Sequence, residues 1–233
     1  MRNLRAINLY GSKVANAHRY PAPLHDTIVE PFAGGAGYSL LHHERQVILV
    51  DADPNISNVW RYLIDTAPDE ILQLPLIEPG QDVRELDCCE GGRLLISWCV
   101  DQAPGPRWHL RKAAAARLAL GRADFWGARR RAQAALIAGR VKHWRIFAGH
   151  YSYAPAVEAT WFVDPPYFDG GKHYRTHTID YPSLALWCRE RRGQVIVCER
   201  QGADWLPFRP LYDAPTLVTK PGKRARSFEA IWP

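Results

Sequence analysis

Short apolar runs, each bounded by charged residues, glycine or proline, set the pattern of the first part of the chain. Residues 26–30 and 46–50 have the length and composition of buried strands, and a glycine-rich stretch at 31–37 precedes a helical pattern at 38–43. A strand, a helix and a second strand in this order predict a β-α-β unit and therefore a parallel sheet. A further helical pattern spans residues 56–64.

The same alternation returns in the last third of the chain. Residues 159–163 and 194–198 predict two more buried strands, and the pattern between them predicts a helix over 181–191. The tail holds two further apolar runs, at 217–219 and 228–232, around a basic turn.

The middle of the chain differs in character. Prolines and glycines break its first half, and an alanine-rich stretch follows with strong helix formers at 113–120 and 129–138. We therefore expect an α/β protein whose sheet is built from residues 1–67 and 147–233, with a mostly helical insert over residues 68–146.

Composition excludes several classes of protein. The chain has 233 residues, of which 47% are apolar and 23% charged, and this balance is typical of a folded domain and not of a disordered tail. No apolar run approaches the length of about 18 residues that a membrane span needs, and the first residues lack the pattern of a signal peptide. Five cysteines without a C-x-x-C pair argue against a disulfide framework and a structural zinc site. We expect a cytoplasmic protein.

The positive charge is concentrated in one segment. Residues 107–145 hold eleven lysines and arginines and one acidic residue, Asp124, so this segment carries +10 while the whole chain carries +6. A nearly neutral body with one basic segment indicates a nucleic-acid binder, although an arginine-rich, solvated helical face would give the same count. The residues that we expect to contact DNA are Arg107, Arg111, Lys112, Arg129, Arg130, Arg131, Lys142 and Arg145.

The glycine-rich turn after the first predicted strand suits a ligand. Its residues are Glu30, Pro31, Phe32, Ala33, Gly34 and Gly35. Open α/β sheets bind ligands at the carboxyl ends of their strands, and glycines allow the backbone to approach closely. Asp51 ends the next strand and is suited to hold both hydroxyls of a ribose. The spacing differs from the G-x-G-x-x-G dinucleotide pattern, and an unliganded turn is the alternative.

A more specific signal follows the strand at 159–163, namely Asp164, Pro165, Pro166 and Tyr167. Two prolines stiffen the backbone and remove two amide donors. The Asp164 carboxylate and the Pro165 carbonyl are then able to accept both N–H groups of one exocyclic amine, and Tyr167 offers a flat surface for a base turned out of its helix.

With these motifs in this order, the chain resembles the Dam-like DNA adenine-N6 methyltransferases, and in particular their compact phage-type members. The resemblance implies a Rossmann-like sheet that binds S-adenosylmethionine, a target-recognition insert in the position of the basic segment, and a bacterial or phage-infected host. It implies a catalytic role for Asp164 to Tyr167, methionine binding by the glycine-rich turn and ribose binding by Asp51. It also adds Tyr10, Gly11, Ser12 and Lys13 as an amino-terminal cofactor motif.

One position departs from the family pattern. Members usually carry an acidic residue that contacts the cofactor adenine, where this chain has His150 followed by Tyr151. A neutral imidazole nitrogen is able to make that contact, which would keep both residues in the cofactor site; the alternative is that the contact is missing.

The resemblance predicts methyl transfer from S-adenosylmethionine to adenine in double-stranded DNA, with neither a metal nor a membrane involved. His42 and His43 are adjacent rather than at ligand spacing, and His173 and His177 fall in a polar loop. Three alternatives remain open: methylation of RNA or of a protein amide, a non-catalytic DNA-binding protein with the same fold, and a nicotinamide oxidoreductase, which the glycine spacing disfavours. The oligomeric state is left open.

Overall fold

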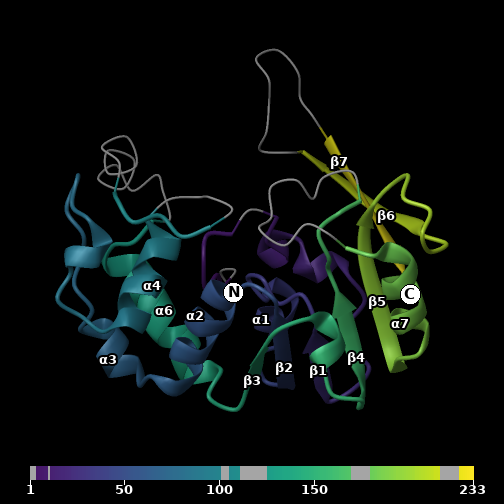
Figure 1. Cartoon of the computed structure of the whole chain (residues 1–233), viewed down its shortest axis with the longest axis horizontal. Coiled ribbons are helices and arrows are strands. Elements are labelled where there is room, and N and C mark those ends of the chain that lie inside the picture. The colour runs from purple at the N-terminus through teal and green to yellow at the C-terminus, as the bar shows by residue number, and fades with distance from the viewer. Residues whose placement is uncertain (1–3, 10, 101–104, 111–124, 169–178, 216–225) are drawn as a thin grey trace.

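The computed structural model describes residues 4–9, 11–100, 105–110, 125–168, 179–215 and 226–233. In this part of the chain seven strands form one mixed sheet in the order β3-β2-β1-β4-β5-β7-β6, with helices packed against it (Figure 1). The protein therefore has an α/β fold. The strands are β1 (Thr27–Glu30), β2 (Gln46–Asp51), β3 (Arg145–Ala148), β4 (Glu158–Val163), β5 (Arg192–Arg200), β6 (Arg209–Pro215) and β7 (Arg226–Trp232).

Strands β1 to β5 are parallel, and β7 runs antiparallel to both of its neighbours, β5 and β6. The predicted parallel sheet is therefore confirmed for five strands, four of which the apolar runs predicted. The run at 228–232 lies in β7, and the run at 217–219 lies outside the described residues. Strands β3 and β6 were not predicted. Strand β3 was missed because its apolar run, Ile146 to Ala148, has only three residues, which is too short to indicate a strand at the sheet edge.

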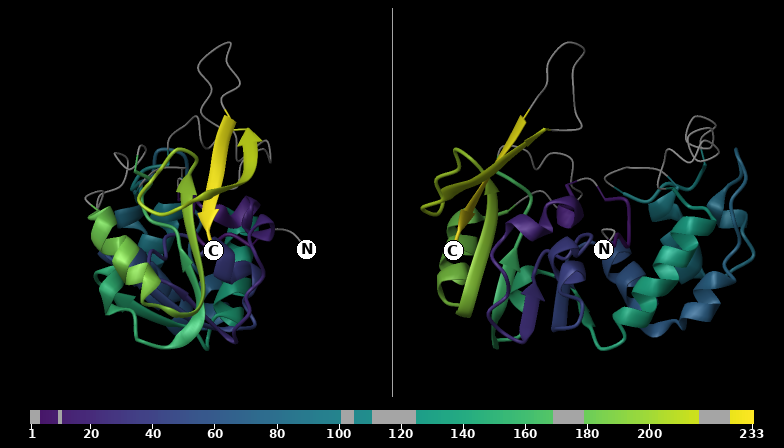
Figure 2. Two further views of the ribbon diagram at one scale, coloured as in Figure 1. Left: turned by 90° about the vertical axis from the view of Figure 1, so that its right-hand side faces the viewer. Right: turned by 180° about the vertical axis from the view of Figure 1, so that it is seen from behind.

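Both faces of the sheet are buried, which explains the continuous apolar runs in its central strands. Neighbouring residues point to opposite sides: Ile28, Leu49 and Phe162 belong to one apolar cluster, and Val29 and Val163 belong to the other. Helix α7 (Tyr181–Arg189) covers the second face, and the amino-terminal 3-10 turns η1 (Lys13–Ala15) and η2 (Ala17–Arg19) lie on the first, as Figure 2 shows.

The remaining helices are α1 (Gly37–Leu41), α2 (Pro54–Asp65), α3 (Pro68–Leu72), α4 (Glu90–Cys99) and α6 (Ala128–Arg140), together with the 3-10 turns η3 (Val83–Glu85) and η4 (Tyr151–Tyr153). Of these helices, α2, α3, α4 and α6 lie beside the β3 edge, and α1 lies over the sheet (Figure 1). Helix α6 contains the helix predicted at 129–138, and the one predicted at 113–120 lies outside the described residues. The apolar side chains of α3, α4 and α6 join the cluster of the first sheet face, so residues 68–146 share their core with the sheet. Residues 145 and 146, placed in the predicted insert, belong to β3.

None of the described helices combines the length and the apolar character that crossing a lipid bilayer requires.

A buried arginine ties α6 to the amino-terminal segment. Arg130 is only 1% exposed, and its guanidinium donates hydrogen bonds to Asn8 Oδ1 (3.1 Å) and Gln133 Oε1 (2.7 Å). A buried charge is costly unless hydrogen bonds such as these stabilise it, so both contacts contribute to holding α6 against the amino-terminal segment.

We predict that Arg130→Ala lowers the free energy of unfolding by about 2–4 kcal/mol, because it removes the hydrogen bonds of the guanidinium to Asn8 and Gln133 and leaves a cavity where the long side chain was buried. The adjacent Arg129 is exposed, so Arg129→Ala is the matched control and should change stability by no more than about 0.5 kcal/mol. Urea denaturation of both variants measures the difference. Equal effects would show that the buried guanidinium does not anchor α6.

Candidate functional site

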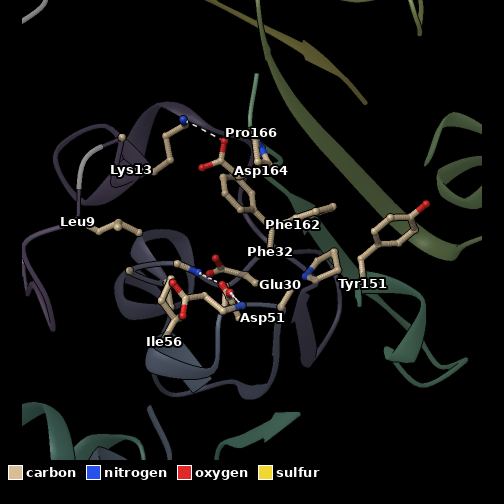
Figure 3. A pocket seen from close by; sticks show the side chains of 18 of the residues that line it. Leu9, Lys13, Glu30, Phe32, Asp51, Ile56, Tyr151, Phe162, Asp164 and Pro166 are labelled. Carbon is tan, nitrogen blue, oxygen red and sulfur yellow. Dashed lines mark hydrogen bonds and ion pairs between the residues drawn. The ribbon is translucent and has the colours of Figure 1, made fainter. Parts of the chain in front are cut away.

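A cavity of about 690 Å³ opens at the carboxyl ends of β1, β2 and β4. The order of the strands reverses between β1 and β4: β2 and β3 are added on one side of β1, and β4 and β5 on the other. Such a topological switch point leaves a crevice in which ligands bind. The volume falls within the range typical of small-molecule sites. Figure 3 shows the Lys13–Asp164 pair on one side of the cavity and Asp51 on the other.

The glycine-rich turn forms the floor of the cavity. All six of its predicted residues line it: Glu30, Pro31, Phe32, Ala33, Gly34 and Gly35. Gly34 has a φ of +45°, a conformation that glycine adopts without strain, and its carbonyl accepts a hydrogen bond from Trp60 Nε1 at 2.8 Å. A Cβ on Gly35 would lie 2.9 Å from Ser12 Oγ, so glycine lets the two segments touch.

Glu30 is buried below this turn. It is 2% exposed, and its Oε1 accepts a hydrogen bond from the Ser39 backbone N–H at 2.7 Å. Burial raises the pKa of Glu30 to about 8, although the Ser39 hydrogen bond opposes the rise. The carboxyl group therefore becomes ionised only near or above neutral pH unless a positive ligand is bound.

Asp51 ends β2 and contacts the turn directly. Its Oδ2 accepts from the Gly34 N–H and its Oδ1 from the Asp53 N–H, both at 2.8 Å. Burial raises the pKa of Asp51 to about 6, against the effect of these two hydrogen bonds. The two backbone donors orient the carboxylate at the edge of the cavity.

Asp164, at the carboxyl end of β4, forms an ion pair with Lys13. Lys13 Nζ lies 3.0 Å from Asp164 Oδ1, and both side chains are largely buried. Burial raises the pKa of Asp164, while the lysine opposes that rise. For Lys13, burial alone would lower the pKa, but the carboxylates of Asp164 and Glu229 raise it above its ordinary value. The lysine is therefore a permanent cation beside the predicted catalytic acid.

Two further residues of the predicted catalytic tetrapeptide, Pro166 and Tyr167, are held by hydrogen bonds. The Pro166 carbonyl accepts a hydrogen bond from the Tyr181 hydroxyl at 2.7 Å, and Tyr167 donates one to Glu229 Oε2 at 2.6 Å. Lys13 Nζ lies 4.6 Å from the centre of the Tyr167 ring. Asp164 and Pro166 line the cavity, whereas Pro165 and Tyr167 are not among its lining residues.

The amino-terminal motif and the histidine also reach the cavity. Gly11, Ser12 and Lys13 line it, as do His150 and Tyr151; Tyr10 lies outside the described residues. The His150 side chain is exposed, and its Nδ1 lies 2.8 Å from Ser152 Oγ. The ring contacts that of Tyr151 at a centroid distance of 4.0 Å. Segments that lie as far apart in the sequence as Gly11 and Asp164 therefore line the same cavity.

Further lining residues were not predicted. They are Leu9, Ala36, Gly37, Ala52, Asp53, Ile56, Phe162, Ile179, Asp180 and Ser183. Asp180 is the N-cap of α7 and accepts hydrogen bonds from the Ser183 backbone and hydroxyl. An aspartate directly before a helix is an N-cap signal that did not enter the prediction of the helix at 181–191, and nothing in the sequence shows that this cap lines the cavity.

The structure separates the predicted DNA contacts into two groups. Arg107, Arg129, Lys142 and Arg145 have exposed side chains, and the ammonium of Lys142 also donates to the backbone carbonyls of Ile64 and Thr66 at the end of α2. The prediction is wrong for Arg130, because its guanidinium is in the core. Arg131 is half-buried and donates to the Leu74 carbonyl at 2.6 Å, which gives it a structural role. Arg111 and Lys112 lie outside the described residues.

No protein-family model matches the chain, and a comparison with curated proteins finds no significant match.

The raised pKa of Glu30 links the protonation of the site to the stability of the fold. Below the ordinary pKa of 4.5, the carboxyl is neutral in both the folded and the unfolded chain. Between pH 4.5 and 8 the folded chain keeps the proton and the unfolded chain loses it, so the free energy of unfolding falls as the pH rises through this window. Glu30→Gln keeps an acceptor for Ser39 and removes the charge.

We therefore predict that Glu30→Gln raises the free energy of unfolding at pH 8 by about 1–3 kcal/mol and leaves it nearly unchanged at pH 4.5. Urea denaturation at both pH values measures the effect, with the exposed Glu158→Gln as control. A gain of equal size at both pH values would contradict the burial of an ionisable Glu30.

Proposed function

We propose that this chain is an S-adenosylmethionine-dependent methyltransferase that modifies the N6 amine of adenine in double-stranded DNA. The observation that carries the proposal is the convergence of distant motifs on one cavity: Lys13 from the amino-terminal turn, the glycine-rich turn, Asp51 and Asp164. These motifs are far apart in the sequence, at residues 11–13, 30–35, 51 and 164.

The charge of the cavity supports a cationic ligand. The described residues that line it include five acidic side chains and one lysine: Glu30, Asp51, Asp53, Asp164, Asp180 and Lys13. Glu30, with its pKa raised to about 8, becomes negative near neutral pH only when a positive group binds. An excess of acids in a chain of net charge +6 favours a ligand with positive groups, and S-adenosylmethionine carries a sulfonium and an ammonium group.

Shape and hydrogen-bonding capacity fit the same cofactor. Ser12 Oγ is buried against the turn and has no hydrogen-bond partner among the described residues, so it is available to a polar group of a ligand. Asp51 is positioned for hydroxyl groups, and Leu9, Phe32 and Ile56 supply apolar wall for an adenine ring.

The strand order provides fold-level support. The order β3-β2-β1-β4-β5, all parallel, is shared with doubly wound sheets that bind nucleotides at the β1–β4 switch point. Fold alone does not define an activity, so the proposal depends on the residues of the cavity.

S-adenosylmethionine, when bound, supplies a methyl group attached to a positively charged sulfur. The residues of the chain act on the accepting amine: the Asp164 carboxylate accepts an N–H, which localises the nitrogen lone pair. Lys13 favours the ionised form of Asp164 despite its burial. As the amine nitrogen becomes positive, the same carboxylate stabilises that charge, and the tetrapeptide fixed by Tyr181 and Glu229 holds it in place.

We predict that Asp164→Ala lowers methyl transfer at least about 100-fold and leaves cofactor binding largely intact, because the carboxylate acts on the amine. Transfer of labelled methyl groups from S-adenosylmethionine to duplex DNA, followed by detection of N6-methyladenine, measures activity, and calorimetry measures cofactor binding. The exposed Asp26→Ala is the control. Near-normal transfer by Asp164→Ala would contradict the assigned role, and label found only in RNA or in adenine-free DNA would contradict the substrate.

The second prediction concerns DNA. If the exposed basic side chains contact phosphates, log affinity falls with log salt concentration by about 0.9 per phosphate neutralised. The double variant Arg129→Glu/Arg145→Glu should weaken binding to all sequences alike and flatten this slope, with cofactor affinity unchanged. Fluorescence anisotropy with labelled duplexes at several salt concentrations measures both quantities. An unchanged slope would mean that DNA binds on another surface.

A further inference from the structure

Glu229, on β7, lies behind the candidate active site and contacts several of its parts at once. It is 8% exposed, and its Oε2 accepts hydrogen bonds from the hydroxyls of Tyr167 (2.6 Å) and Tyr20 (3.2 Å). The same oxygen lies 3.9 Å from Lys13 Nζ. One carboxylate oxygen therefore joins the amino-terminal turn to the catalytic tetrapeptide.

The backbone at Glu229 is fixed on both sides. Strand β7 lies between β5 and β6, and Glu229 pairs with Arg200 of β5 and with Tyr212 of β6. Glu229 is not among the residues that line the cavity, so it has no direct contact with a ligand there. Any effect of Glu229 on the positions of the reacting groups therefore passes through its contacts with Lys13 and Tyr167.

These two residues meet the catalytic acid. Lys13 contacts Asp164 at 3.0 Å and also lies over the Tyr167 ring, so the ammonium is surrounded by two carboxylates and one aromatic face. An ammonium group on a flexible four-carbon chain has many alternative positions, and a second carboxylate restricts them. Glu229 of β7 also accepts the hydrogen bond of the Tyr167 hydroxyl, so it restrains both Lys13 and Tyr167 beside Asp164.

We propose that Glu229 is a positioning residue for methyl transfer, which holds Lys13 and Tyr167 in place and thereby orients Asp164 toward the acceptor amine. This inference rests on the proposed function and extends it to a residue outside the cavity. No resemblance to a known motif points to this position.

The same geometry gives Glu229 an electrostatic effect. Its carboxylate is a like charge near Asp164 and raises the pKa of that residue. Replacing it with a neutral amide should therefore lower the pKa of Asp164. The charged or titratable groups with electrostatic influence on Asp164 or its partners are Lys13, Tyr20, Glu30, Tyr167, Cys198, Glu199, Tyr212 and Glu229.

The test is Glu229→Gln in the full chain. We expect kcat for methyl transfer to duplex DNA to fall about 10- to 100-fold, while the Kd for S-adenosylmethionine changes less than about threefold, since Glu229 does not line the cavity. The acid limb of the kcat profile should move to lower pH. Without substrate, carbon-13 NMR of the Asp164 carboxyl should show its titration midpoint shifted the same way.

Two further variants separate positioning from general stability. Tyr167→Phe removes the hydroxyl and keeps the charge of Glu229, so kcat should fall without a shift of the Asp164 midpoint to lower pH. Tyr212→Phe removes a hydroxyl that lies 3.5 Å from that of Tyr20, one step further out, and should leave kcat and the midpoint unchanged.

The outcomes are distinguishable. A Glu229→Gln variant that loses thermal stability but keeps the parent's kcat and Asp164 midpoint would overturn the positioning role. If the parent chain transfers no methyl group, the proposed function fails and the catalytic part of the inference fails with it. If Glu229→Gln does not fold, a Tyr167→Phe variant with the parent's kcat would still overturn the inference.

Discussion

The ion pair between Lys13 and Asp164 is the contact on which the candidate site depends. It joins a turn near the start of the chain to the carboxyl end of β4, across the switch point of the sheet. A buried carboxylate and a buried ammonium are each costly alone, and at 3.0 Å each offsets the desolvation of the other. The glycines of the turn at 34–37 make this possible, because they let the Ser12–Lys13 segment pack directly against the end of β1.

Around this pair, acidic and basic side chains lie in different places. Carboxylates gather inside the cavity, while the exposed arginines lie on the outside of a chain that is basic as a whole. The acids inside are costly to ionise, as the raised pKa values of Glu30 and Asp51 indicate. A protein keeps such destabilising groups where they serve a ligand, which agrees with a site for a cationic molecule.

The sequence alone was sufficient where a buried strand ends in a distinctive turn. The apolar runs before the glycine-rich turn, Asp51 and Asp164 located β1, β2 and β4 and put their ends at one edge of a parallel sheet. It was insufficient where a neighbour in space decides the outcome. Arg130 looks like any exposed arginine of a basic helix, and only its contact with Asn8 shows that it is buried. Glu229 is one polar residue in an alternating strand, and nothing local indicates that it faces Lys13.

The placement of β7 has a consequence for the order of folding. This strand follows β6 in the chain but lies between β5 and β6, and β6 pairs with β7 alone among the described strands. During synthesis β6 therefore emerges before β7, the strand with which it is paired in the structure, and the β5 edge that β7 covers is still open at that stage. Once β7 is made, it closes the sheet edge and delivers Glu229 in the same event. Placement of Glu229 against Lys13 and Tyr167 is thus coupled to completion of the sheet, and a nascent chain that lacks β7 also lacks this carboxylate.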